Sequence, residues 1–147
     1  MESIAYLIMS YNNNATGGHY RSLFSIYNYY RAFYNIKVIN IGFIKSPVFT
    51  SVAENDFIFF KINLFNFFYS FIKIFKYLNK NNFDIFHCYD TESLFIAKLY
   101  ILLNNNSNIK LIYTKCGGPN FKFYPFAPVV VTFSIENYLQ NRKLTAK

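Results

Sequence analysis

Short apolar runs alternate with amphipathic segments along this chain, and the alternation limits the folds open to it. The first run, Ile4–Met9, is almost continuously apolar, which is typical of a strand buried on both faces of a parallel sheet. Residues 19–34 then carry apolar side chains at three- and four-residue spacing, which predicts a helix, and Lys37–Ile41 predicts a second strand. Two such strands joined through a helix form a right-handed βαβ unit with parallel strands.

One long amphipathic helix is predicted from Phe57 to Lys80. At 100° per residue its lysines gather on one side. The opposite side is a narrow apolar stripe, expected to be buried, of Phe60, Leu64, Phe67, Phe71, Ile74 and Leu78. Residues 42–56, which precede it, have no clear period, although Val48–Val52 is compatible with a short edge strand. The lysines of the predicted basic face are Lys61, Lys73, Lys76 and Lys80.

Strands and helices alternate to the end of the chain, which predicts a single α/β domain. The sheet is expected to be open, doubly wound and mostly parallel, hence Rossmann-like, and 147 residues suit one such domain. In such sheets, ligands bind beyond the carboxyl ends of the strands, where the strand order reverses. The remaining predicted elements are strands at Asp84–Cys88, Ile109–Thr114 and Val129–Phe133, a helix over residues 92–104, a proline-rich loop over Gly117–Pro128 and a helix from near Ser134.

The turn after the first predicted strand has the features of an anion site. Gly17 and Gly18 directly precede a predicted helix, and small residues there let a ligand approach the free N–H groups and the positive end of the helix dipole. His19 and Arg21 place cations in the first helical turn, where they oppose the dipole unless a bound anion compensates them. The alternative is a flexible turn with solvated side chains, because a glycine pair is not a full phosphate-binding motif.

A second group of candidates follows the strand predicted at residues 84–88. His87 lies near the end of this strand, and Asp90 follows at the expected crevice. A lone histidine at a strand end is more often a hydrogen-bonded core residue than a catalyst. Asp90 or Thr91 suits the N-cap of the next helix, and capping is the role that the local pattern favours for Asp90. Tyr89 is a poor base but a good hydroxyl donor or stacking platform.

The segment Thr114–Asn120 predicts a further ligand-facing loop after an interior strand. It combines the cation of Lys115 with two small residues, Gly117 and Gly118. The alternative is an ordinary strand-ending turn, which Gly-Gly-Pro-Asn also suits. Cys116 lacks the histidine and acid partners in sequence that would support a nucleophile, and the chain has no zinc-ligand spacing.

The net charge and the cysteines indicate which partners and which cell compartment are expected. Fifteen Lys and Arg residues against seven Asp and Glu give a net charge of +8, which favours anionic partners. Only three of the fifteen are arginine, and no zinc-finger or RNA-binding signature is present, so nucleic acid is not the expected partner. Cys88 and Cys116 are expected to be reduced thiols, and no apolar segment is long enough to span a membrane, which predicts a cytoplasmic protein.

The predicted basic face of residues 57–80 suggests peripheral contact with the inner face of an anionic membrane. Each lysine near such a surface contributes about 1 kcal/mol of attraction, so four of them localise a protein weakly. A genome rich in A and T explains the lysines equally well, because lysine codons are rich in these bases.

The order of four segments along the chain is informative: Gly17–Ser22, Phe83–Asp90, Tyr113–Asn120 and Phe133–Asn137. Together they resemble the N-terminal half of GT-B glycosyltransferases of the family 4 type, and the resemblance covers nearly the whole chain. It implies a retaining, metal-independent transfer of a sugar from a nucleotide-diphosphate donor, in a cleft between two Rossmann-like domains. Residues 1–147 are then the acceptor-side domain, and the donor-binding domain, with its pair of glutamates eight residues apart, has no counterpart in the sequence.

The resemblance also implies roles for the candidate residues. The glycine pair approaches the donor phosphates, and His87 and Asp90 are the catalytic candidates. Many relatives have a histidine where Tyr89 stands, and often one where Cys116 stands, so these two positions depart from the family pattern. No cofactor or metal is implied beyond the nucleotide sugar as co-substrate. The residues implied to bind the donor phosphates or the acceptor are Gly17, Gly18, His19, Arg21, Tyr89, Lys115, Gly117 and Gly118.

Several classes of function stay open at this point. The leading hypothesis is a glycosyltransferase domain that transfers a hexose-type sugar to a polysaccharide or glycolipid acceptor and is inactive without a donor-binding domain. One alternative is a truncated glycosyltransferase fragment that catalyses nothing. Another is a basic α/β module that binds a membrane or nucleic acid.

Overall fold

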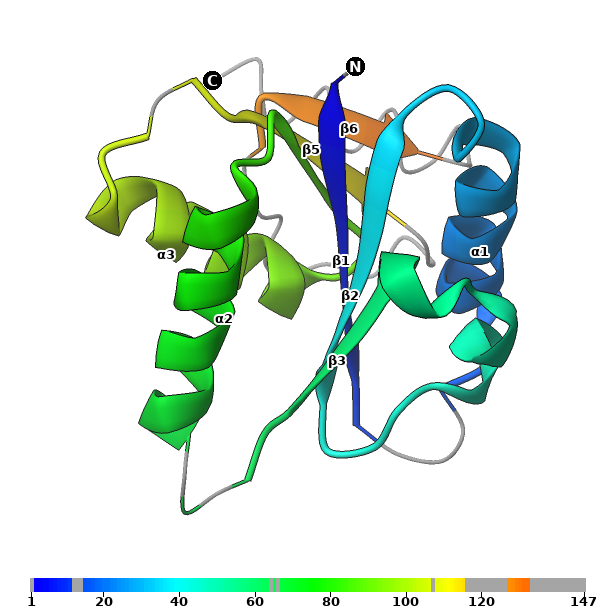
Figure 1. Cartoon of the computed structure of the whole chain (residues 1–147), viewed down its shortest axis with the longest axis horizontal. Coiled ribbons are helices and arrows are strands. Elements are labelled where there is room, and N and C mark those ends of the chain that lie inside the picture. The colour runs from blue at the N-terminus through cyan, green and yellow to red at the C-terminus, as the bar shows by residue number, and fades with distance from the viewer. Residues whose placement is uncertain are drawn as a thin grey trace.

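Parallel strands form the centre of the molecule in a computed structural model (Figure 1). The structure describes residues 2–11, 15–63, 65, 67–106, 108–115 and 127–132. Within these ranges one sheet has six strands in the order β3-β2-β1-β4-β5-β6, and every neighbouring pair is parallel. The strands are β1 (Ser3–Ser10), β2 (Asn35–Gly42), β3 (Phe57–Lys61), β4 (Ile85–Cys88), β5 (Lys110–Lys115) and β6 (Val129–Thr132).

Helices cover both faces of the sheet, as a doubly wound fold requires (Figure 1). Helix α1 (Gly18–Tyr30) lies on one face, and α2 (Phe67–Asn81) and α3 (Thr91–Leu103) lie on the other. Two short 3-10 helices, η1 (Pro47–Ser51) and η2 (Glu54–Asp56), lead from β2 to β3. None of the helices in the described ranges is long and apolar enough to cross a membrane.

Successive residues of β1 point to opposite faces of the sheet and so divide the core in two. Tyr6 and Ile8 pack with α1, whereas Leu7 and Met9 pack with α2 and α3. Both sets are buried because each face has its own helical cover, which is why the run of residues 4–9 is apolar throughout and does not alternate.

Most of the elements predicted from the sequence are confirmed. Strands β1, β2, β4, β5 and β6 and helices α1 and α3 lie where the apolar patterns placed them, with ends shifted by a few residues. The single-domain, Rossmann-like α/β fold is therefore confirmed for the described part of the chain. Most of the predicted loop over residues 117–128 and all of the helix predicted from residue 134 lie outside the described residues.

The helix predicted from Phe57 to Lys80 is wrong over its first part. Residues 57–61 form the edge strand β3, which pairs with Val38–Gly42 of β2, and the helix α2 starts only at Phe67. Phenylalanine and isoleucine fit strands well, and the open edge of β2 offers backbone partners that a helical period cannot reveal. Lys61 therefore lies on β3, apart from the lysines of α2.

Val48–Val52, which the sequence left open as a short edge strand, belong mainly to η1 and form no strand. Ser46 caps the start of η1: its side chain accepts a hydrogen bond from the Val48 N–H. Pro47 then occupies the first turn, where its missing N–H costs nothing. Phe49 points into the core and contacts Tyr20 of α1, so η1 serves as cover for the α1 face of the sheet.

The strand order reverses between β1 and β4. The chain leaves β1 toward β2 on one side, and it leaves β4 toward β5 on the other. The carboxyl ends of β1 and β4 lie next to each other, with Leu7 paired to Cys88. In a doubly wound sheet this is the position of the ligand crevice.

Candidate functional site

A small polar pocket of about 150 Å³ lies at this crevice. Its walls come from the start of α1, the β4–α3 turn and the carboxyl end of β5. Four residues predicted from the sequence meet there: His19, Tyr89, Asp90 and Lys115. Sequence reasoning did not assign the other three lining residues, Thr91, Glu92 and Tyr113, to the site. All three lie close to the carboxyl ends of β4 and β5, and that position could have identified them as lining residues.

Asp90 joins the end of β1 to the start of α3. One carboxylate oxygen accepts the Ser93 N–H at 2.7 Å, which makes Asp90 the N-cap of α3, as the local pattern predicted. The other oxygen accepts the Met9 N–H at 2.6 Å. Burial raises the pKa of Asp90 to about 6, although these N–H bonds favour the charged form. The carboxylate therefore connects two elements of the crevice and also lines the pocket.

The glycine pair opens the N-terminus of α1. Gly17 is the N-cap and has no side chain to cap the helix, and its carbonyl accepts the N–H groups of Tyr20 and Arg21. A Cβ atom added to Gly18 would meet no described atom within 4 Å. Packing among the described residues therefore does not require glycine at this position. An open helix N-terminus without side chains suits the close approach of an anion.

The two predicted cations of α1 differ in their surroundings. His19 is half-buried against the ring of Tyr20, with ring centroids 4.1 Å apart, and it lines the pocket. Burial lowers the pKa of His19, so its ring is neutral near pH 7. Arg21 is exposed and is not among the lining residues. The structure therefore brings His19 into the pocket and leaves Arg21 outside it.

His87 lies behind the pocket wall, on the face of the sheet that α1 covers. Its Nε2 atom is 2.6 Å from the Thr114 hydroxyl, and its ring stacks on Tyr89 with centroids 4.5 Å apart. Burial lowers the pKa of His87 to about 4, so the imidazole is neutral at pH 7. His87 does not line the pocket. In this geometry its ring supports Tyr89, which does line the pocket.

Lys115 supplies the one ammonium group among the pocket's lining residues. It ends β5, and only 6% of it is exposed. The β4–α3 turn adds the carboxylates of Asp90 and Glu92, and Tyr113 lines the pocket from β5. The pocket thus offers both a positive charge for a phosphate and oxygen acceptors for sugar hydroxyls. The other two predicted loop residues, Gly117 and Gly118, lie outside the described residues.

The described residues thus form a Rossmann-like α/β domain with a polar crevice at the switch point of its sheet. The chain is similar to a structure of HepE from Anabaena in complex with UDP and glucose, with a TM-score of 0.66 and 13% identity, over 97% of this chain and 41% of that chain. It is also similar to a glycosyltransferase from Rickettsia africae, with a TM-score of 0.53 and 17% identity, over 78% of this chain and 29% of that one.

These similarities establish a glycosyltransferase-like fold. The chain spans less than half of the length of either protein. No family model matches the chain, and no curated protein matches it.

Proposed function

We propose that this chain is the N-terminal, acceptor-side domain of a GT-B glycosyltransferase of the family 4 type. In this proposal it takes part in transferring a hexose-type sugar from a nucleotide-diphosphate donor to a glycolipid or polysaccharide. The observation that carries the proposal is the crevice itself, where the open N-terminus of α1 and the polar pocket meet at the switch point of the sheet. The fold shared with HepE supports it.

The described residues suit two tasks in such a reaction. The N–H groups at Gly17 and Gly18 and the ammonium of Lys115 would neutralise the leaving diphosphate, without a metal ion. The oxygens of Asp90 and Glu92 would accept hydrogen bonds from the acceptor hydroxyls and orient them. Bond exchange with retention then depends mainly on position and electrostatic stabilisation.

The size of the pocket fits half of a shared site. Its volume of about 150 Å³ is below the roughly 300–1,000 Å³ typical of complete small-molecule sites. In the proposal a second Rossmann-like domain holds the nucleotide and closes the cleft over this pocket. The 147 residues alone are therefore expected to bind diphosphate weakly and to transfer no sugar.

Titration with inorganic pyrophosphate tests the phosphate role. We expect the backbone amide signals of Gly17, Gly18 and His19 to shift in NMR spectra, because these N–H groups face the anion. Gly18→Ala should weaken binding about tenfold or more, since the added methyl occupies the space that the phosphate needs. The same variant should unfold no more easily than the wild type, because alanine lowers the entropy of the unfolded chain.

Ser25→Ala, in the exposed part of the same helix, is the control and should bind pyrophosphate like the wild type. Unchanged binding by Gly18→Ala, or shifts confined to the lysines of α2, would contradict the proposal.

We also propose that the domain touches an anionic membrane. Lys73, Lys76 and Lys80 are all exposed on α2, and this helix has no acidic residue. Vesicles that contain phosphatidylglycerol should pellet the protein at low salt and release it at high salt, because attraction of about 1 kcal/mol per lysine is screened.

Changing these three lysines to glutamine should abolish pelleting. Changing Arg31, Lys45 and Lys110 to glutamine removes the same charge elsewhere and should preserve it. Equal pelleting with neutral vesicles would refute the contact.

A further inference from the structure

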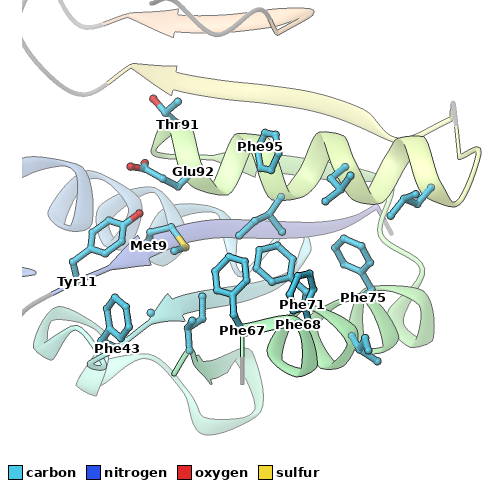
Figure 2. A pocket seen from close by; sticks show the side chains of 16 residues that line it. Met9, Tyr11, Phe43, Phe67, Phe68, Phe71, Phe75, Thr91, Glu92 and Phe95 are labelled. Carbon is cyan, nitrogen blue, oxygen red and sulfur yellow. The ribbon is translucent and has the colours of Figure 1, made fainter. Parts of the chain in front are cut away.

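A second, larger hollow lies between α2 and α3 and is almost entirely apolar (Figure 2). Its volume is about 760 Å³, within the range of sites that take a whole small molecule. Phe67, Phe71 and Phe75 line it from α2, and Phe95 lines it from α3, as Figure 2 shows. Met9, at the end of β1, also lines it. We call this hollow the apolar groove.

Large apolar side chains stand exposed around the groove. Phe68 is 84% exposed, Phe95 63% and Leu103 65%. After its first turn, helix α3 has Lys98 as its one charged residue, so most of its outer side is apolar, as is its buried side, where Leu94 and Ala97 pack against the sheet. A helix that is apolar around most of its circumference is normally covered on more than one side. Contiguous apolar surface of this kind marks a binding site.

The groove leads to the polar pocket. Thr91 and Glu92 line both hollows, and Figure 2 shows them together at one end of the groove, away from Phe75. A molecule whose apolar part fills the groove therefore has its polar end at the first turn of α3. This is the wall of the pocket that carries the Asp90 and Glu92 carboxylates.

The chemistry of the walls favours a hydrocarbon over an extended polypeptide. Apart from the Tyr11 hydroxyl, the polar side chains of the lining are Thr91 and Glu92, both at the pocket end. A peptide bound in an extended form would bring backbone N–H and C=O groups that find no partners along the remaining walls. A hydrocarbon chain brings none. The exposed lysines of α2, on the outer side of the same helix, also suit a lipid surface from which such a chain would come.

We propose that the apolar groove binds the hydrocarbon chain of a lipid-linked acceptor and places its head group in the polar pocket. The assignment of this lipid as an acceptor rests on the proposed function. Of the two acceptor classes named there, it selects the glycolipid over the polysaccharide. The hydrocarbon site itself follows from the walls of the groove alone.

Calorimetric titration with n-alkyl β-D-glucosides of six to twelve carbons, below their micelle concentrations, tests the proposal. These probes are uncharged, so the lysines do not contribute. Affinity should rise by up to about fourfold per added methylene, which corresponds to ~0.8 kcal/mol for each buried CH₂. Affinity that does not depend on chain length would overturn the proposal.

Two variants with equal exposure locate the site. Phe95→Asp places a charge in the groove wall and should weaken binding of the longest glucoside about tenfold or more. Phe33→Asp is the control: Phe33 is also 63% exposed, but it follows α1 on the other side of the molecule, so binding should stay unchanged. Equal losses in both variants would contradict the location, and circular dichroism would verify that both remain folded.

Glucoside binding tests the groove, and pyrophosphate binding tests the proposed function, so the two can fail independently. Pyrophosphate binding without glucoside binding would refute the groove and leave the phosphate site standing. Chain-length-dependent glucoside binding without pyrophosphate binding would support the hydrocarbon site and refute the phosphate role. If Phe95→Asp abolishes a dimer seen by sedimentation and the wild type binds no glucoside, the groove is instead an interface between two copies.

Discussion

Gly42→Ala should lower the free energy of unfolding by about 4 kcal/mol or more. Gly42 ends β2 with φ at +156°, a conformation that L side chains rarely adopt. A Cβ atom built there would lie 1.8 Å from the carbonyl oxygen of Ser10, which is backbone and not the end of a flexible side chain. Backbone strain of about 1–3 kcal/mol and overpacking of a similar size therefore add up.

The neighbouring strand has little freedom to relieve this clash. The carbonyl oxygen of Ser10 accepts the Phe43 N–H at 3.1 Å. The Ser10 hydroxyl accepts a hydrogen bond from the Asn40 amide at 2.9 Å and donates one to the carbonyl of Ile44. Ser10, Asn40 and Ser46 are all buried, so a shift of β1 would break hydrogen bonds that water cannot replace.

Urea unfolding followed by circular dichroism measures the effect of Gly42→Ala. Gly18→Ala is the matched control, since the same added methyl meets no described atom within 4 Å and should cost nothing. A loss below about 1 kcal/mol in Gly42→Ala would mean that β1 and β2 separate more easily than the hydrogen bonds around Ser10 imply.

Asp90→Ala should lower the free energy of unfolding by about 3 kcal/mol. Loss of the α3 cap costs about 1 kcal/mol, and the Met9 N–H, left without its acceptor in a buried position, costs about 1–3 kcal/mol more. The free energy of unfolding of Asp90→Asn should fall between those of the wild type and Asp90→Ala, because an amide has only one oxygen for two N–H donors.

Chemical denaturation of these variants beside Glu92→Ala checks this prediction. Glu92 also lies in the first turn of α3, but it is exposed, so its removal should cost well under 1 kcal/mol. Equal stability of Asp90→Ala and Glu92→Ala would show that Asp90 does not tie β1 to α3.

Much of the site was predictable because parallel strands bring their carboxyl ends together. His19, Tyr89, Asp90 and Lys115 were singled out from three segments that lie far apart in sequence, and they meet at one pocket. Arg21 does not join them, because a helix turns by about 100° per residue and this side chain points into solvent.

The apolar groove was not predictable. The periodicity placed Phe67 in a buried stripe, yet it is 47% exposed and lines the groove. A spacing of three and four residues identifies one side of a helix, but not whether another element covers it. In this protein Ser70, Ile74 and Leu78 take the buried positions of α2, and the phenylalanines beside them are left at the groove.

The amino-acid sequence by itself determined the alternation of strand and helix, the parallel sheet and the glycine-bearing turn, because these depend on side chains close together along the chain. Only the tertiary structure decided that residues 57–61 pair with β2 as a strand and that Thr91 and Glu92 line two hollows at once. The physical reason is that backbone pairing and surface closure depend on which segments meet in space, and local propensity does not carry that information.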